Sequence, residues 1–383
     1  DTIDFATATA NEDGSYSFKA WNGTVSDITV LSQYTERPPA DCRLLFPHKG
    51  RMLYIGPNLD TKAYDTLFIS NWDDAAHVPQ ALTVDTPPLF GGWIVIGEDG
   101  GEITGLGAWG SYCLIFKRLG IWQLSGETAS DFAITPVSVS HGCVAHETVQ
   151  QIEDGVTVWL DHNHVWAMTT QGIQNIGLPI ERLLKAYSVE QQAQAFAVFD
   201  KGRGWYHLTL PDGVTFVLYR TDSGEWAWSR WTGQPAACGV YATQWCAPGT
   251  YAGDATRPTL CRLNTGCTDE GTPIPFSWTS ATLQAPNAQA DKAVTDIRIY
   301  GSDDLEEYGE AVLTSCTADY HRDSPGAQVT PRAINIDRHA SMGRWCLPFS
   351  TPTKRYHVTL SGSSSTGGIV AAMAIDYHVR GVK

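Results

Sequence analysis

The chain has 383 residues, of which 43% are hydrophobic, so it contains enough apolar material for a buried core and disorder is excluded. Its 41 acidic and 26 basic residues give a net charge of -15, which argues against a surface built throughout to grip phosphates. With 36 glycines, 20 prolines, 14 tryptophans and only 4 methionines, the composition predicts an all-β protein of short strands and tight turns.

The sequence predicts neither a membrane span nor a zinc ribbon. The longest strongly apolar stretch, residues 369–375, is far shorter than the roughly 20 residues that a membrane helix needs. Nine cysteines occur without any paired CxxC spacing, and free thiols are the first interpretation. One or two disulfides among Cys238, Cys246, Cys261 and Cys267 stay open as an alternative. The start of the chain shows no apolar signal core, so we expect assembly in the cytoplasm.

Expected strands recur about every 8 to 12 residues between turn-forming residues, and they fall into groups of four. After an N-terminal segment, residues 1–40, the first group covers residues 43–46, 51–55, 66–70 and 93–97. The next three groups cover residues 103–109, 112–117, 120–124 and 132–139, then 148–152, 156–160, 164–169 and 173–176, then 195–200, 204–210, 214–219 and 225–231. A fifth group covers residues 239–245, 250–252 and 259–264, with 276–282 as a provisional fourth strand.

Tryptophan recurs just beyond the turns of four similar hairpins. Trp122, Trp166 and Trp205 are 44 and 39 residues apart, and Trp226 and Trp228 follow the fourth turn. This period is typical of four-stranded propeller blades, so we predict a β-propeller of about five or more blades over residues 41–285. Closing the ring would need a sixth or seventh blade, or strands lent by residues 15–34. We interpret Trp122, Trp166, Trp205 and Trp228 as structural residues of the blade hairpins, with glycan-stacking platforms as the alternative.

Two further features complete the predicted organisation. Only residues 178–195 have helical spacing, with Pro179 near the first turn, and we expect one helix inserted between blades. After the small, polar stretch 284–290 the strands become longer and alternate. The sequence therefore predicts a separate β-sandwich over residues 286–383.

No constellation in the sequence predicts catalysis, a metal or a cofactor. His162 and His164 flank Asn163 in a turn and could offer two imidazoles to a metal, but ordinary turn chemistry explains them better. Adjacent carboxylates such as Asp73 and Asp74 point to opposite faces of a strand, which favours solvated loops. GxSxG, HExxH, Walker and helix-opening GxGxxG motifs are missing from the sequence. The run 222–228 resembles the Asp-box of sialidases, a structural motif, with Arg220 where a leading serine is expected.

A longer series of motifs resembles one family. The strand 114–116, a Lys117 turn and Ile121-Trp122-Gln123-Leu124-Ser125-Gly126 lead to Gly142-Cys143-Val144 and, further on, to Ile180-Glu181-Arg182-Leu183-Leu184. Residues 48–54 and 67–70 resemble that family's first blade, and residues 375–381 resemble the last strand of its β-sandwich. The family comprises tail hub or nozzle proteins of short-tailed phages, similar to tail tubular protein B and packaged-DNA stabilisation proteins. The resemblance covers roughly residues 40–383.

The resemblance implies a non-enzymatic structural protein of the phage virion. Members of such a family form a hexameric ring below the portal and the head–tail adaptor, contact other tail proteins, and let DNA pass during packaging and ejection. No catalytic residue or cofactor is carried over, and no membrane insertion is expected. An acidic lumen would let DNA slide because it makes few phosphate contacts. The competing hypothesis is a propeller that binds or cleaves glycans, either a receptor-binding tail component or a sialidase-like hydrolase; a cellular scaffold propeller ranks third.

Overall fold

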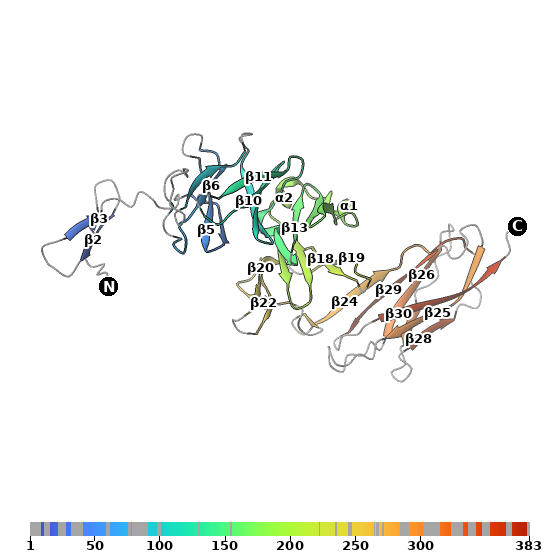
Figure 1. Ribbon diagram of the computed structural model, residues 1–383. Coiled ribbons are helices and arrows are strands. Elements are labelled where there is room, and N and C mark those ends of the chain that lie inside the picture. The colour runs from blue at the N-terminus through green and yellow to red at the C-terminus, as the bar shows by residue number, and fades with distance from the viewer. Residues whose placement is uncertain are drawn as a thin grey trace. The chain divides into compact units, whose positions relative to one another are not determined.

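The computed structural model describes residues 9–10, 16–21, 28–31, 41–58, 62–75, 78, 91–97, 101–128, 131–153, 155–221, 223–233, 236–243, 247–263, 265, 268–269, 272–283, 291–301, 315–322, 332–335, 342–346, 353–364 and 370–380. Strands dominate these residues and form antiparallel sheets, so the predicted all-β class is confirmed. The chain divides into two units, residues 1–263 and 264–383, shown in blue to yellow and in orange to red (Figure 1).

Four antiparallel sheets of four strands follow one another in the first unit, each with its strands in chain order. Sheet 1 contains β4 (Leu44–His48), β5 (Arg51–Gly56), β6 (Thr66–Ile69) and β7 (Gly92–Val95). Sheet 2 contains β8 (Ile103–Trp109), β9 (Tyr112–Lys117), β10 (Ile121–Ser125) and β11 (Ala133–Ser138). Sheet 3 contains β12 (Gln150–Glu153), β13 (Val156–Asp161), β14 (His164–Thr169) and β15 (Gly172–Asn175). Sheet 4 contains β16 (Phe196–Asp200), β17 (Trp205–Thr209), β18 (Thr215–Arg220) and β19 (Trp226–Trp231).

Two smaller sheets flank this series in the chain. Sheet 5 has three strands, β20 (Ala236–Ala242), β21 (Gly249–Asp254) and β22 (Leu260–Arg262). The N-terminal sheet also has three, β1 (Thr9–Ala10), β2 (Tyr16–Trp21) and β3 (Ile28–Leu31). The predicted groups of four strands are thus confirmed for sheets 1 to 4, whereas the fifth group has three strands.

Consecutive sheets pack face to face and share apolar cores. Leu53 and Leu67 of sheet 1 belong to one buried cluster with Ile115 of sheet 2. Phe116 of sheet 2 contacts Trp159 of sheet 3, with ring centroids 5.1 Å apart. Sheets 3 and 4 share the largest cluster, which contains Val158, Leu160, Ala167, Tyr206, Leu208 and Phe216. Because middle strands such as β13 are covered on both faces, they read as nearly continuous apolar runs.

The first strands of the five sheets lie side by side and run in the same direction. Neighbours in this row are β4 and β8, β8 and β12, β12 and β16, and β16 and β20. At the start of the strands, Arg43 forms an ion pair with Glu102, with 3.0 Å between nitrogen and oxygen. At the other end, the Trp109 indole donates to the Gly155 carbonyl, 2.9 Å away. The N-terminal ends of neighbouring first strands therefore lie together, as do their C-terminal ends, so these strands are parallel.

The single helix expected over residues 178–195 is wrong, because the structure has two short helices there. These are α1 (Glu181–Leu184) and α2 (Val189–Gln192). Ser188 between them is extended, with φ -67° and ψ 164°, and its side chain accepts a hydrogen bond from the Gln191 amide in a capping box. A serine that bonds to the backbone ahead of it starts a new helix instead of continuing the old one. No helix in the described parts of the chain has the length and apolarity that a membrane crossing requires.

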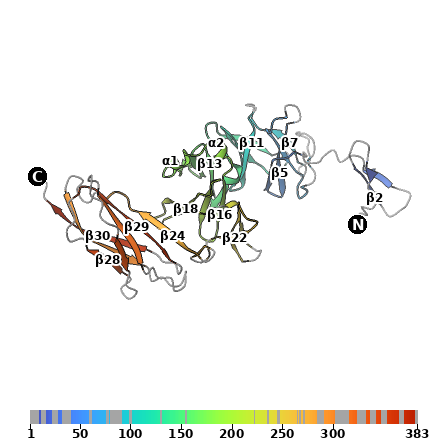
Figure 2. The same cartoon turned by 180° about the vertical axis from the view of Figure 1, so that it is seen from behind.

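Two antiparallel sheets share one core in the second unit (Figure 2). The larger has the order β23 (Thr268–Asp269), β24 (Thr272–Thr279), β29 (Tyr356–Ser364), β26 (Ser315–Arg322) and β27 (Arg332–Asn335). The smaller has the order β28 (Met342–Cys346), β25 (Asp291–Gly301) and β30 (Val370–Arg380). Val294, Ile297 and Ile299 of β25 pack with Ala318, Val358 and Leu360 of the larger sheet.

The division between the units falls after Leu263, earlier than the boundary between residues 285 and 286 that the sequence predicted. The reason is β24, which contains most of the provisional strand 276–282 that the sequence assigns to the fifth group. It pairs with β29, placing Thr279 opposite Thr359. A pairing across 80 residues leaves no local signal in the sequence. The small, polar stretch 284–290 lies outside the described residues.

Strand β24 pairs with the short β23 only at Thr272 and Pro273, so one edge has no partner over most of its described length. The Ser280 amide donates to the Val358 carbonyl, 2.9 Å away, so alternate nitrogens of this segment face β29. Pro275 has the opposite parity, so its nitrogen lies on the unpartnered edge. Because proline has no N–H, this edge offers fewer donors to an additional strand.

Candidate functional site

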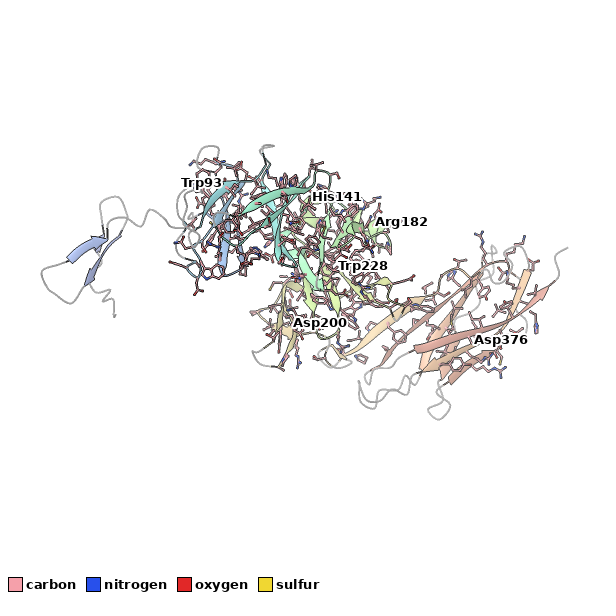
Figure 3. All side chains as sticks on the ribbon, in the orientation of Figure 1. Trp93, His141, Arg182, Asp200, Trp228 and Asp376 are labelled. Atoms are coloured by element: carbon pink, nitrogen blue, oxygen red, sulfur yellow. The ribbon has the colours of Figure 1, made fainter. Side chains whose placement is uncertain are left out.

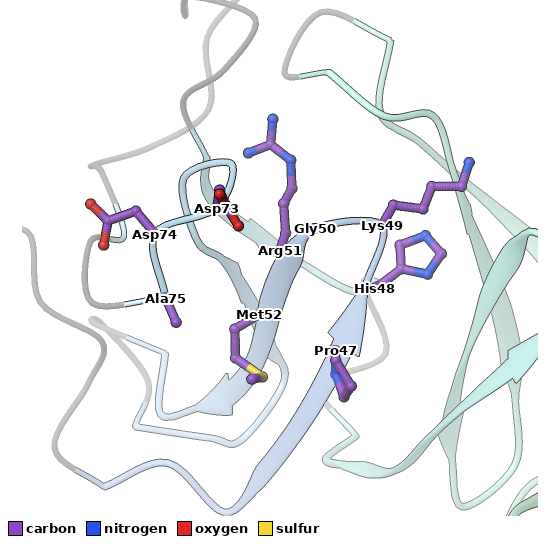
Figure 4. A pocket seen from close by; sticks show the side chains of 9 residues that line it. All are labelled: Pro47, His48, Lys49, Gly50, Arg51, Met52, Asp73, Asp74 and Ala75. Carbon is purple, nitrogen blue, oxygen red and sulfur yellow. The ribbon is translucent and has the colours of Figure 1, made fainter.

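A hollow of 370 Å³ lies at the β4–β5 hairpin and is the first place to look for a site (Figure 4). Its wall is formed by residues 47–52 on one side and by Asp73, Asp74 and Ala75 on the other. Lys49 and Gly50 have φ values of 46° and 71°, which make a left-handed two-residue turn. This turn carries the Lys49 and Arg51 side chains to the same rim (Figure 4).

Arg51 belongs to the scaffold of this hollow. Its guanidinium donates to the Ser70 carbonyl at 2.8 Å and to the Glu127 carbonyl at 3.3 Å. It also lies over the Phe132 ring, 5.2 Å from the centroid. Burial lowers the pKa of Arg51, while the Asp131 carboxylate acts in the opposite direction. A guanidinium held this way fixes the β4–β5 hairpin against the loop after β10, and it has little left for an incoming anion.

Of the other basic groups at the hollow, Lys49 is paired and His48 is half-buried, with its buried Nε2 atom lacking a hydrogen-bond partner among the described residues. The Lys49 ammonium pairs with Glu127, with 3.2 Å between Nζ and Oε1, and donates to the Gly126 carbonyl at 3.4 Å. Burial, assisted by the Lys49 charge, lowers the pKa of His48 to about 4, so this imidazole is neutral at pH 7. The hollow therefore combines neutral, paired and acidic groups, a mixture that suits contact with a polar protein segment.

The structure does not gather metal ligands at the positions considered. Within the described residues there is no group of three or more His, Cys, Asp or Glu side chains that could hold a metal. Asp73 and Asp74 lie in a turn after β6 and line the hollow together with His48, but these three side chains do not form a group that could hold a metal. The sequence has two similar adjacent carboxylate pairs, at residues 303–304 and 306–307, and these lie outside the described residues.

The His162–His164 turn has a structural use. His162 and Asn163 have positive φ values of 30° and 72°, so they form the two-residue turn between β13 and β14. The His162 imidazole meets Asp161 at 2.6 Å, whereas His164 approaches Glu181 of α1 at 3.7 Å. The two imidazoles thus have separate acidic partners.

Sequence reasoning missed Gln192, which fastens the helical insertion to this turn. Its side chain accepts from the Asn163 amide at 2.9 Å and donates to the Asn163 side chain at 2.7 Å. It also donates to the carbonyls of Leu184, at 3.4 Å, and Tyr187, at 3.0 Å. A buried glutamine in a polar helix has no periodic signal, because its partner is 29 residues away.

The tryptophans singled out by spacing occupy different strands. Trp122 in β10 and Trp166 in β14 both lie in the third strand of their sheets. Trp205 begins β17, the second strand of sheet 4, so its expected equivalence to the other two is wrong. The connection between β15 and β16, which contains both helices, is longer than the other connections between consecutive sheets. A tryptophan 39 residues after Trp166 therefore falls in the second strand of sheet 4 and not in the third.

The surroundings of these side chains are those of packing residues. Trp122 packs on the core between sheets 1 and 2, and Trp166 on that between sheets 2 and 3. Trp228, labelled in Figure 3, packs on the core between sheets 3 and 4. The Trp228 indole also donates to the Ile176 carbonyl, 2.7 Å away. Trp205 lies edge-on to Trp231, with centroids 5.9 Å apart. Burial on an apolar core leaves less of each ring for stacking on a sugar.

Hydrogen bonds from a tryptophan indole to a backbone carbonyl also join sheets 2 and 3. Trp159, fully buried in β13, donates to the Gly142 carbonyl at 2.7 Å, as Trp109 does to Gly155. Close to the Asp-box-like run, Arg220 forms a bidentate pair with Glu153 of sheet 3, at 2.9 and 3.2 Å. Hydrogen bonds and an ion pair therefore join neighbouring sheets in addition to their shared apolar cores.

Cysteine side chains in the described part of the chain are free thiols. They are Cys42, Cys113, Cys143, Cys238, Cys261 and Cys346. Burial raises the pKa of Cys113 and of Cys143 to about 12, so both are unreactive small apolar residues. Cys246 and Cys267, the other members of the possible disulfide cluster, lie outside the described residues.

Comparison with known proteins does not assign the chain to a family. No protein-family model matches it, and no curated protein matches it. The function must therefore be argued from the residues and geometry described above.

Proposed function

We propose that the chain is a structural β-propeller protein with a C-terminal β-sandwich, serving as a tail hub or nozzle in the virion of a short-tailed phage. The row of parallel first strands, β4, β8, β12, β16 and β20, carries the propeller part of the proposal. Antiparallel sheets that stack with their first strands together radiate from a common side, as propeller blades do. Sheets 1 to 5 would then be five blades.

A structural role is supported because, among the described residues, the polar side chains of the candidate site bind neighbouring segments of the same chain and are not arranged around a ligand-binding cavity. Arg51, Lys49 and Gln192 bind neighbouring segments of the same chain, and the four tryptophans pack between or beside strands. Polar side chains hold neighbouring sheets together, and the stacked sheets therefore form a stiff wall. A conduit requires a wall of this kind.

The phage assignment rests on the motif series in the sequence, and charge is compatible with it. In this proposal copies of the chain assemble as a hexamer in the host cytoplasm, join the adaptor and other tail proteins, and let DNA through without holding it. The net charge of -15 suits a passage that repels phosphates. The glycan-binding alternative loses support because Trp228, its best candidate, packs on a core and donates to Ile176.

Electron microscopy of the purified protein, alone and with portal and adaptor, tests the proposal. We expect six-fold rings that attach below the adaptor. A chain that stays monomeric and never enters a particle would contradict it. A glycan array run on the same preparation separates the alternative, since specific binding there without ring formation would favour a receptor-binding protein.

A further inference from the structure

Sheet 5 is the one blade of the proposed propeller whose outer face the described residues leave open. Its inner face packs on sheet 4, because Gly239 approaches Phe196 and Val198 of β16 closely. Cys238 and Val240 alternate with Gly239 and so lie on the opposite face, where they are joined by Tyr251 and Leu260. Arg262 lies on this face too, and its guanidinium donates to the Pro248 carbonyl. Val240 is 57% exposed and Leu260 66% exposed.

The edge of sheet 5 is incomplete as well. Sheets 1 to 4 have four strands each, whereas sheet 5 ends at β22. In the described part of the chain no strand pairs with β22 on the side away from β21. An exposed apolar face beside an open strand edge is a site at which further β-structure docks.

Sheet 1 of a second copy of the chain is poorly suited to pack on the open face of sheet 5. The back of sheet 1 is capped by its own chain, since Tyr54 and Phe68 pack with Val78. The Tyr54 hydroxyl also donates to the Ala75 carbonyl. A head-to-tail stack of sheet 5 on sheet 1 would have to displace that cap.

The N-terminal sheet fits the place by composition and by reach. Its β2 and β3 pair Trp21 with Ile28 and Phe18 with Leu31. Because β1 has only two residues, the sheet is little more than this hairpin, and a two-stranded hairpin is marginally stable by itself. The 13 steps from Leu31 to Leu44 span at most about 45 Å. In an uncurved stack the docked sheet would lie five gaps of about 10 Å, roughly 50 Å, from sheet 1, which is slightly beyond the linker. A stack that curves as propeller blades do brings the outer face of sheet 5 closer to sheet 1, so in the proposed propeller the linker reaches it.

We infer that the N-terminal sheet of this chain docks on the Cys238–Val240–Tyr251–Leu260 face of sheet 5 of the same molecule. The inference rests on the proposed propeller and names the segment that would continue its ring. It would bury Cys238 and supply β-structure beside β22.

Thiol labelling of the full chain tests the inference, because Cys346 on β28 is a second exposed free cysteine and acts as an internal control. N-ethylmaleimide modification is followed for each cysteine by peptide mass spectrometry. We expect Cys238 to react at least about tenfold more slowly than Cys346 at every protein concentration, since it must wait for local opening. Two double variants each place charges on one face of the N-terminal sheet: Trp21→Asp/Ile28→Asp on one face and Phe18→Asp/Leu31→Asp on the other. The variant that alters the face packed on sheet 5 should restore the reaction rate of Cys238.

Three results would overturn the inference. Equal rates for Cys238 and Cys346 in the unmodified chain would show an open face. Protection that survives both double variants would assign the cover to another segment. Protection that disappears on dilution would assign it to a second copy. None of these results decides whether the protein forms rings by electron microscopy, so the two proposals fail separately.

Discussion

Gln192 shows how a single buried amide organises a connection. It satisfies the Asn163 turn on one side and two helix carbonyls on the other. Gln192→Ala would leave these buried groups without partners, at a cost of about 1–3 kcal/mol in the free energy of unfolding. Denaturant titration measures the change, and Gln174→Ala on the exposed side of β15 is the control. Equal stability of the two variants would mean that the amide bonds contribute little.

His207 makes stability depend on pH. Burial in β17 lowers its pKa to about 4, with Asp200 opposing and Arg203 assisting. In the unfolded chain the pKa is about 6.5, so between these values the unfolded state binds more protons. The stability contributed by neutral His207 is complete above about pH 6.5 and is lost as the pH falls towards 4.

The pH prediction is a comparison of two variants by thermal unfolding. The gap in stability between the unmodified chain and His207→Gln should narrow as the pH falls from 7 to about 4.5, because only the former pays for protonating a buried imidazole. His378→Gln, at an exposed site, should show a constant gap. A constant gap for His207→Gln too would mean that the imidazole is already solvated.

At the scale of elements, the joint between sheets 2 and 3 depends on a residue without a side chain. Gly142 lies against the Arg118 backbone, and a methyl group there would overlap the Arg118 carbonyl. Its own carbonyl accepts from Trp159, while its amide donates to Asp161 at 3.1 Å. The chain cannot move away from Arg118 without loosening both bonds.

Gly142→Ala should therefore lower the free energy of unfolding by about 3 kcal/mol or more, as strained core substitutions do. Gly110→Ala is a matched control, because its φ is +57° but nothing lies near the added methyl group. That control should lose only the roughly 1–2 kcal/mol of left-handed strain. Circular dichroism during chemical unfolding measures both, and similar losses would argue against close packing at Gly142.

The positions of most strands could be predicted from the sequence, but the pairing of strands that lie far apart in the chain could not. The groups that became sheets 1 to 4 are local meanders, so alternation and turn residues located nearly every strand. β24 was placed with the wrong neighbours because its partner β29 follows 80 residues later. Residues 178–195 have a helical period, but Ser188 bonds to its own backbone and divides them. Gln192 and Arg51 act through distant partners, which no spacing reveals.

At the scale of the whole molecule, each unit has its own apolar core and should unfold with its own transition. Val358 is fully buried in the second unit and Val217 is nearly so in the first. Val→Ala removes two buried methyl groups, which costs about 1–3 kcal/mol and lowers the melting temperature by several degrees. In differential scanning calorimetry Val358→Ala should shift one transition and Val217→Ala the other. A single transition shifted by both would show that the units unfold together.

Pro275, on the free edge of β24, has a consequence for synthesis. A ribosome adding about 5–20 residues per second needs roughly 4–16 s to make the 80 residues that separate Thr279 from Thr359. Throughout that interval the strand has emerged but its partner has not been made. Nascent chains translated side by side on one message would hold many such waiting strands. Pro275 deprives them of a donor on the free edge, which slows pairing between neighbouring chains until each second unit can fold.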